Sequence, residues 1–415
     1  NGSETLTVNP AAGTAIYDKA GNAASTSQSN NTASLTEKIL PTITDVTSTT
    51  GNGSYKQGET IAITVEFSEA VNVDESGGTP TLTLNNTSGT NPAVNYSSGS
   101  GSTTLTFNYT IGSGETSGDL DYATTSSLVL NSGTIKDAAL NAATLTLASP
   151  GATNSLRANK DLIVDTSVPT ISSVSLNAAN SELTVTFAED VYNTNGGSGD
   201  LEVADFALSI SGGAAEVNAT PASIAKTAQN IWVLGLTLTG GTANGSETLT
   251  VVPAASTAIY DKAGNAASTS QSNNTASLPE QVLPTVTGVT STTGNGSYKQ
   301  GETIAITVAF SEVVNVTGTP QLTLETGGSD AVVDYSSGTG SNTLTFNYTI
   351  GAGHTSSDLD YESTSSLGLN GGAIKDAALN AATLTLASPG ATNSLGHNKA
   401  LIVDTTVPTV TGVTS

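Results

Sequence analysis

The run Thr60-Ile61-Ala62-Ile63-Thr64-Val65-Glu66-Phe67 places large apolar residues at every second position. Such a period of two puts the apolar side chains on one face of a strand and the polar ones on the other. Residues 81–84, 104–111, 127–130 and 144–147 repeat the pattern. Gly, Asn and Pro separate the runs as turn signals. The chain is therefore predicted to be all-β, with half-buried antiparallel sheets and at most one helical turn, at residues 137–143.

The composition narrows the class of protein. The 415 residues include no Cys and no Met, and 35 acidic residues stand against 11 basic ones, for a net charge of −24. A nucleic-acid partner is not expected, because few cations could neutralise a phosphate backbone. Membrane insertion is not expected either, because no run of 18 apolar residues occurs. With no disulfides possible, an extracellular protein of this kind needs another stabilising element, and acidity favours cation binding.

An internal repeat sets the domain organisation. Residues 1–40 match residues 244–283 at 35 of 40 positions. The spacing of 243 residues is far longer than a solenoid repeat and fits two domains. Two alternating module types, A and B, are therefore predicted.

A short motif marks each junction: an acidic residue stands four places before a Pro-Thr pair. The four acids are Glu37, Asp165, Glu280 and Asp404. They predict the C-terminal part of a type B module at 1–40, type A at 41–168, type B at 169–283, type A at 284–407 and the start of a further module at 408–415. Because the chain opens in the middle of the pattern, we expect it to be a fragment of a longer protein.

Types A and B share two further features. An acid follows the Phe of a strand, as in Phe67-Ser68-Glu69, where we expect the strand to end. An Asp-x-Ala-x-Asn turn comes later, with Gly264 inside the type B copy and Leu140 or Leu379 inside the type A copies. Leucine makes a left-handed backbone less favourable there. Modules of 115 to 128 residues suit a sandwich of seven to nine strands.

These three marks resemble those of bacterial immunoglobulin-like repeats in giant cell-surface proteins. Type B also resembles repeats in adhesins of Bacteroidota, among them gliding-motility (SprB-like) adhesins. The resemblance implies tandem immunoglobulin-like β-sandwich domains in a linear array, outside a bacterial cell. It also implies a non-enzymatic stalk that extends a distal binding region, with neighbouring repeats of the same chain as contacts.

Strand order places three acids at each junction. In a sandwich with strands A to G, the B–C and F–G turns lie at the pole where the linker enters. Carboxylate oxygens from separate loops suit Ca²⁺, which would offset their repulsion and fix the angle between domains. The expected groups are Glu37, Glu69 and Asp137; Asp165, Glu189 or Asp190, and Asp261; and Glu280, Glu312 and Asp376.

A second acidic group is expected at the opposite pole of type A. It consists of Asp119 and Asp121 in the first copy and Asp358 and Asp360 in the second, which could approach the outgoing linker acids Asp165 and Asp404. Type B offers only Glu247 at the matching place. For all these acids the structural alternative stays open, because Asp and Asn in turns commonly cap their own backbone.

Catalysis finds little support. The two histidines, His354 and His397, are replaced by Glu115 and Ala158 in the other type A copy, and no Cys is present. We therefore expect surface substitutions and no enzyme activity. Two other functions remain as alternatives: the modules themselves could bind a glycan, ice or another surface ligand, or the chain could be a filament subunit that exchanges a strand with its neighbour.

Overall fold

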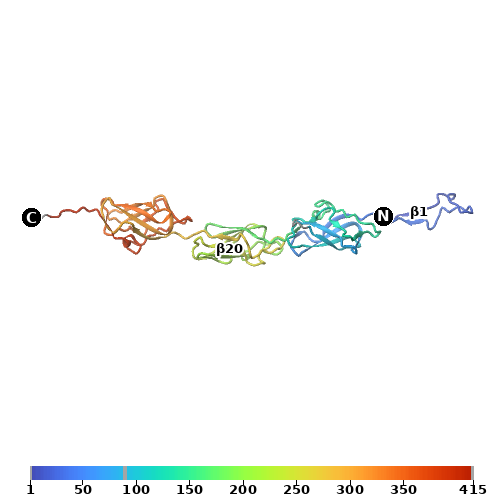
Figure 1. The fold of residues 1–415 in the computed structure, drawn as a ribbon, viewed down its shortest axis with the longest axis horizontal. Coiled ribbons are helices and arrows are strands. Elements are labelled where there is room, and N and C mark those ends of the chain that lie inside the picture. The colour runs from blue at the N-terminus through green and yellow to red at the C-terminus, as the bar shows by residue number, and fades with distance from the viewer. Residues whose placement is uncertain (1, 87–90, 413–415) are drawn as a thin grey trace.

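The computed structural model describes residues 2–86 and 91–412, so the last three residues of the predicted module at 408–415 lie outside the described part. Figure 1 shows three β-sandwiches end to end in one line, with residues 2–40 projecting beyond the first. Three separate hydrophobic cores lie within residues 46–164, 171–278 and 289–403. The predicted fold class, an all-β linear array of tandem immunoglobulin-like sandwiches, is confirmed. No described helix is long and apolar enough to cross a bilayer.

The described residues of the first type A module form ten strands and one helical turn. Their bounds are β3 (Ile43–Ser48), β4 (Gly53–Tyr55), β5 (Thr60–Asp74), β6 (Thr81–Asn85), β7 (Ala93–Ser98), β8 (Ser102–Thr110), β9 (Asp121–Tyr122), β10 (Leu128–Val129), β11 (Thr134–Lys136), α1 (Leu156–Asn159) and β12 (Leu162–Val164). The main sheet runs β10-β6-β7-β8-β5-β11, with β3 also on β5 and β9 on β6. The parallel pair β12-β4 completes the module.

The second type A module repeats this arrangement. Its elements are β22 (Val286–Ser291), β23 (Gly296–Tyr298), β24 (Thr303–Thr317), β25 (Gln321–Leu324), β26 (Ala331–Ser337), β27 (Ser341–Thr349), β28 (Thr355–Ser356), β29 (Leu367–Gly368), β30 (Ala373–Lys375), α2 (Leu395–Asn398) and β31 (Leu401–Asp404). Strand β24 pairs with β22, β27 and β30, as β5 pairs with β3, β8 and β11. The alternation read from the sequence therefore gives the same topology in both copies.

The type B module is divided into smaller sheets. Its elements are β13 (Ile171–Leu176), β14 (Glu182–Phe187), η1 (Val203–Asp205), β15 (Phe206–Ser211), β16 (Ala215–Val217), β17 (Ser223–Ala228), β18 (Ile231–Gly235), β19 (Leu238–Gly240), β20 (Thr248–Pro253) and β21 (Thr275–Ser277). The sheets are β13-β14-β18-β17, β15-β20-β21 and β16-β19. Trp232 on β18 is 1% exposed and forms part of the core.

Strand β5 differs from the sequence expectation at its end. We expected the strand to end at Phe67-Ser68-Glu69, but β5 continues to Asp74. Its register against β8 shifts between Glu66 and Val71, so Glu69 lies in an irregular stretch. Beyond it, β5 pairs with β11. An irregularity of this kind bends a strand, which here lets one strand serve two parts of the sheet.

Two local features differ from the sequence expectation: the strand at residues 144–147 and the position of the helical turns. Residues 144–147 form no strand, because Thr144 makes a single bridge to Thr42 beside the incoming linker. No helix forms at residues 137–143. The helical turns are α1 and α2, each capped by a serine, Ser155 or Ser394.

Leu140 and Leu379 have left-handed backbones, with φ of 68° and 73°, contrary to the expectation for leucine. Each closes its turn by an N–H bond to the carbonyl of Asp137 or Asp376. Turn closure therefore prevails over a side-chain preference of about 1–2 kcal/mol.

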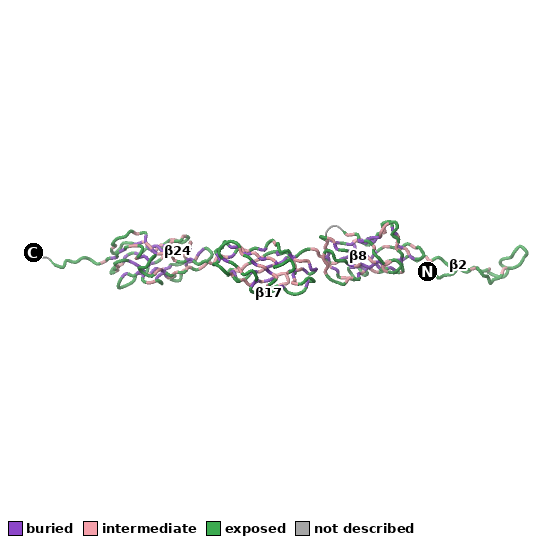
Figure 2. The backbone as a smooth tube through the Cα atoms, turned by 90° about the horizontal axis from the view of Figure 1, so that it is seen from below, coloured by how far each residue is buried: buried purple, intermediate pink, exposed green. Residues whose placement is uncertain are grey.

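Within residues 2–40, β1 (Thr5–Thr7) and β2 (Thr32–Ser34) form an antiparallel pair at the base of a long loop, in which Tyr17 bridges Ala23. Figure 2 shows this segment as almost entirely exposed, in contrast to the three sandwiches. The equivalent residues 244–283 lie inside the type B module, where β13 to β19 cover them.

Candidate metal centres at the module junctions

One group of three carboxylates lies at each of the three junctions that are followed by a described sandwich. Each group combines the linker acid, the acid after the Phe of a central strand, and the Asp of the Asp-x-Ala-x-Asn turn. One oxygen of each member lies within 4.8 Å of the others. The groups are Glu37, Glu69 and Asp137; Asp165, Glu189 and Asp261; and Glu280, Glu312 and Asp376. The structure thus brings together acids that are about 100 residues apart in the chain.

The linker acids are oriented by their own linkers. The N–H of Ser167 donates to Asp165 Oδ1 at 2.9 Å. The N–H groups of Ile39 and Val282 donate in the same way to Glu37 and Glu280. In each case the donor follows the acid by two residues, which is the geometry of a side chain that caps its own turn. This contact leaves carboxylate lone pairs for other partners.

The turn asparagine completes each group, and it was not among the site residues predicted from the sequence. Asn141 Nδ2 donates to Asp137 Oδ2 at 2.7 Å and to Glu37 Oε2 at 2.6 Å. Asn380 makes the equivalent bonds to Asp376 at 2.9 Å and to Glu280 at 2.7 Å. The recurrence of Asn four residues after the Asp, in every copy of the turn, was the signal that could have identified it.

At the second junction the asparagine contacts the linker backbone. Asn265 Nδ2 donates to Asp261 Oδ2 at 2.7 Å and to the carbonyl of Asp165 at 2.9 Å. Asn141 and Asn380 also donate to the carbonyls of Glu37 and Glu280, at 3.4 and 3.3 Å, so the backbone contact recurs at all three junctions. The additional bond to the side chain of the linker acid is described where that acid is the longer Glu. The Asp turn is therefore tied to the preceding linker at all three junctions, through the side-chain oxygen or through the backbone.

Burial and neighbouring charges raise the pKa of the acid that follows the Phe. For Glu189 burial is the largest cause, followed by the charges of Asp261 and Asp165, and its pKa is raised to about 7. Burial, then the other two acids of their own groups, also raises the pKa of Glu69 and of Glu312. Each group therefore resists carrying its full negative charge without a cation.

The turn aspartates Asp137 and Asp261 are both buried, but their pKa values shift in opposite directions. Burial raises the pKa of Asp261 above its usual range, although hydrogen bonds from Asn265 oppose the shift. Burial also acts to raise the pKa of Asp137, but hydrogen bonds donated by Asn141 lower it overall. The turn Asp of the second junction therefore binds its proton more tightly than the turn Asp of the first junction.

Asp190 lies outside the second group, which contains Glu189. Its charge nevertheless contributes to the raised pKa of Glu189. Of the two residues proposed from the sequence, the structure therefore selects Glu189 as the member with an oxygen close to Asp165 and Asp261.

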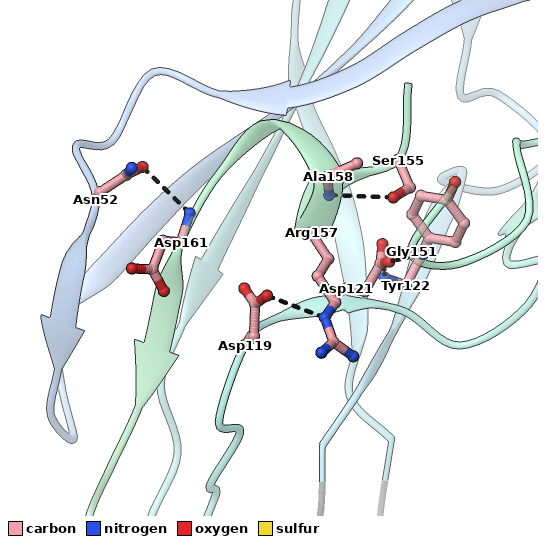
Figure 3. A network of polar contacts seen from close by, with 9 residues as sticks. All are labelled: Asn52, Asp119, Asp121, Tyr122, Gly151, Ser155, Arg157, Ala158 and Asp161. Atoms are coloured by element: carbon pink, nitrogen blue, oxygen red, sulfur yellow. Dashed lines mark hydrogen bonds and ion pairs between the residues drawn. The ribbon is translucent and has the colours of Figure 1, made fainter. Parts of the chain in front are cut away.

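Asp119 and Asp121 do not join Asp165. In Figure 3 Asp119 points to Arg157, whose Nε lies 3.0 Å from Asp119 Oδ2. Asp121 is 3% exposed and accepts the N–H groups of Tyr122 and Gly151, each at 2.9 Å. Within the described residues neither acid belongs to a group of three. Both instead hold the loop around α1 in place.

The second type A module repeats half of this arrangement. Asp360 accepts the N–H groups of Tyr361 at 2.9 Å and Gly390 at 2.8 Å. Gly396 occupies the position of Arg157, so Asp358 faces no equivalent guanidinium. Asp404 accepts the N–H of Thr406 at 2.8 Å, which lowers the pKa of that carboxyl. The predicted approach of these acids to Asp404 yields no group of three among the described residues.

Glu247 has a structural role in type B. It is 0% exposed and accepts the N–H groups of Ala214 at 3.0 Å and Asn244 at 2.9 Å. Burial acts to raise its pKa, but backbone hydrogen bonds from Ala215, Asn244 and Ala214 lower it overall. The carboxylate is already surrounded by donors and holds the loop before β20.

The two histidines lie in different environments. His354 is half-buried and stacks on Tyr348, with its Nδ1 2.8 Å from the tyrosine hydroxyl. In the first module Glu115 accepts the hydroxyl of Tyr109 at 2.7 Å in the same position. His354 is therefore the hydrogen-bond partner of a buried tyrosine and not the surface substitution that was expected. His397 is exposed.

The three groups fit a calcium ion in donor chemistry and spacing. Ca²⁺ takes oxygen ligands at about 2.3–2.6 Å, so opposite ligands lie about 4.6–5.2 Å apart. Oxygens within 4.8 Å of one another are compatible with that range. The Asn amide donates hydrogen bonds to the Asp and to the linker residue. It thereby orients the carboxylates, as an outer-shell partner of a metal ligand does.

A family model described as "Bacterial Ig-like domain" matches residues 37–149. This range begins at the first linker acid and includes Glu69 and Asp137. The first type A module is therefore similar to that family over the same residues that form the first acidic group. No curated protein matches the chain.

Two solved structures are similar to the chain at low identity. One is the surface layer protein SbsC, domains 1–6, with 13% identity, a TM-score of 0.21, and coverage of 89% of this chain and 55% of that chain. The chain thus spans about half the length of that structure. The other is a putative membrane anchored protein from Corynebacterium diphtheriae, with 11% identity, a TM-score of 0.20, and coverage of 83% and 91%.

Proposed function

We propose that this chain is a non-enzymatic stalk segment of a large bacterial cell-surface adhesin, and that Ca²⁺ stiffens its junctions. The observation that carries the proposal is the recurrence of one three-carboxylate group at three successive junctions of a linear array. The similarity of residues 37–149 to bacterial immunoglobulin-like domains supports an extracellular setting. Such a segment holds a binding region away from the cell and contacts the neighbouring repeats of its own chain.

The geometry explains how a cation would act. In each group the linker acid precedes the Pro-Thr pair, whereas the other two acids belong to the module that follows. When bound, Ca²⁺ supplies positive charge that links these carboxylates. The chain's own residues position the oxygens: the turn Asn holds the Asp and the linker, and the linker N–H holds the linker acid.

Thermal unfolding of the whole chain with Ca²⁺ and with a chelator tests the proposal. A ligand at 100 times its Kd stabilises the folded state by about 2.7 kcal/mol per site, so the melting temperature should rise with Ca²⁺. Small-angle scattering should show a larger maximum dimension with Ca²⁺ than with the chelator, because the joints bend less.

The variant Glu312→Gln provides the control. It should abolish the response at the third junction and leave the responses at the first two. Equal melting and equal extension with Ca²⁺ and chelator would refute the calcium role, and a compact scattering profile under both conditions would refute the stalk.

A further inference from the structure

Two neighbouring strands separate in the second type A module and leave a groove. Strands β26 and β27 pair only through Tyr335 with Phe346 and Ser337 with Thr345. Toward its N-terminus β26 pairs with β25 instead, while β27 continues to Thr349 along β24. The resulting groove has a volume of about 590 Å³, and residues 330–336, 347–349 and 354 line it.

The edges of this groove carry backbone groups without a strand partner. Tyr335 N–H donates to the carbonyl of Pro320 at 2.8 Å, so by alternation Val332 and Asp334 direct their N–H and C=O groups away from β25. Ile350 donates its N–H to the carbonyl of Glu302 at 2.9 Å and accepts the N–H of Gly301 at 2.9 Å, so by the same alternation Asn347 and Thr349 direct their N–H and C=O groups away from β24. Both edges therefore face the groove, each with the donors and acceptors that another strand would need.

The first type A module has the same groove, so the feature belongs to the module type. Strands β7 and β8 pair only through Tyr96 with Phe107 and Ser98 with Thr106. The groove between their other halves measures about 340 Å³. The two rims differ in charge, because Asn91 and Asn95 of the first module stand where the second has Asp330 and Asp334.

We propose that the groove between β26 and β27 receives an extended, basic peptide segment of another protein as an added strand. Each edge offers two facing residues along about 7–10 Å of strand, enough for a short segment. Val332, which is 58% exposed, offers an apolar contact, and Asp330 and Asp334 attract cationic side chains. A second copy of this chain is a poorer occupant, because its net charge is also −24.

Hydrogen exchange of the whole chain with the synthetic peptide acetyl-Lys-Val-Thr-Val-Lys-amide tests the proposal. We expect saturable protection of residues 331–334 and 347–349. The double variant Asp330→Asn, Asp334→Asn should weaken binding about fivefold, to the level of the first groove. The substitution should not prevent folding, because the first module carries asparagine at both positions.

Two control peptides separate strand addition from general charge attraction. A peptide with N-methyl groups at alternate residues cannot pair fully and should not protect the groove. A peptide with glutamates in place of lysines should bind more weakly. Equal binding of the N-methylated peptide, protection outside the two grooves, or an unchanged affinity of the double variant would overturn the proposal. Protection that grows with protein concentration alone would also overturn it, in favour of a second copy.

Discussion

The junction at Asp165 and the junction at Glu280 contain the same kind of three-carboxylate group but differ in how the modules touch. At Asp165 the side chain of Lys56, from the preceding module, reaches into type B. Its Nζ donates to the carbonyl of Gly264 at 2.8 Å and to Asn195 Oδ1 at 3.0 Å. At Glu280, within the described residues, no side chain of the type B module reaches past the linker to donate a hydrogen bond to the following module. There the linker residue Glu280 itself is the acceptor for Asn380.

This difference indicates that the acidic group alone does not define a rigid joint. The Asp165 joint has a cation supplied by the protein, the Lys56 ammonium, at its edge. The Glu280 joint depends on one asparagine and, under our proposal, on Ca²⁺. Under the proposed function, the array should therefore alternate between joints that remain ordered without Ca²⁺ and joints that loosen.

The largest expected effect comes from Gly264→Leu at the lysine contact. Gly264 has φ of +87°, and a Cβ there would lie 2.2 Å from Asn195 Oδ1. The left-handed backbone costs leucine about 1–2 kcal/mol, and the side chain must also displace Lys56 and Asn195. Hydrogen exchange should rise at residues 261–265 and at residue 56.

Gly21→Leu is the matched control, because the same turn at residue 21 has no atom within 4 Å of a Cβ. It should show the backbone cost alone. The reverse change, Leu379→Gly, should stabilise its turn by about 0.5 kcal/mol, since glycine removes the left-handed strain but gains entropy in the unfolded chain. Equal effects of the two leucine substitutions would show that the lysine contact adds nothing.

The next effect distinguishes the two joints through their asparagines. Asn380→Ala removes the bonds to Asp376 and Glu280, and Asn265→Ala removes those to Asp261 and Asp165. Loss of a partner for a buried polar group costs about 1–3 kcal/mol locally. Without Ca²⁺, distance distributions between spin labels on the two flanking modules should broaden more for Asn380→Ala. The opposite order would contradict the role of Lys56.

A smaller effect is expected from the pH dependence of the Asp165 joint. The pKa of Glu189 is about 7 in the folded state, above its ordinary 4.5. Between these values the folded state binds more protons than the unfolded state, so metal-free stability is greatest at the lower pH and falls as pH rises to about 7. Glu189→Gln should flatten this slope in thermal unfolding and weaken Ca²⁺ binding. A slope unchanged by the variant would exclude Glu189 as its source.

The smallest effect on stability is expected for Lys56→Met. The substitution keeps an apolar stem and removes two partly exposed hydrogen bonds, each worth about 0.5–1.5 kcal/mol at most. Its main consequence should be angular: the spin-label distances across Asp165 should become as broad as those across Glu280. An unchanged distribution would mean that the linker and Asn265 suffice to hold this joint.

Much of the candidate site could be predicted from the sequence, because its parts recur at fixed places. The nine acids of the three groups follow from one motif per turn, strand end and linker, combined with the strand order of a sandwich. A search for charged side chains does not indicate the asparagine, because its side chain is neutral. The separation of Asp119 from Asp165 could not be read from spacing, since it depends on Arg157 and α1, which lie late in the module.

Features that depend on which strands pair were harder to predict from the sequence. The extension of β5 to Asp74 results from an irregularity that lets it pair with β11, a strand about 60 residues away. The left-handed Leu140 is held by a turn whose ends are paired, through Lys136 and Ala142. Alternation of residue types describes neither the bend nor the closure, because both depend on which partner the backbone finds.

The two near-identical copies of one sequence separate local from tertiary information. In both, the Asn of the turn donates its N–H to the Asp, at 2.9 Å for Asn22 and Asp18 and at 2.8 Å for Asn265 and Asp261. The sequence by itself determined this turn, because all its partners lie within five residues. The burial of the apolar side chains, in contrast, depends on the rest of the module. Ile16 is 56% exposed while Ile259 is fully buried. Only the second copy has β13 to β19 packed over it, and apolar burial requires a surface that the segment itself does not contain.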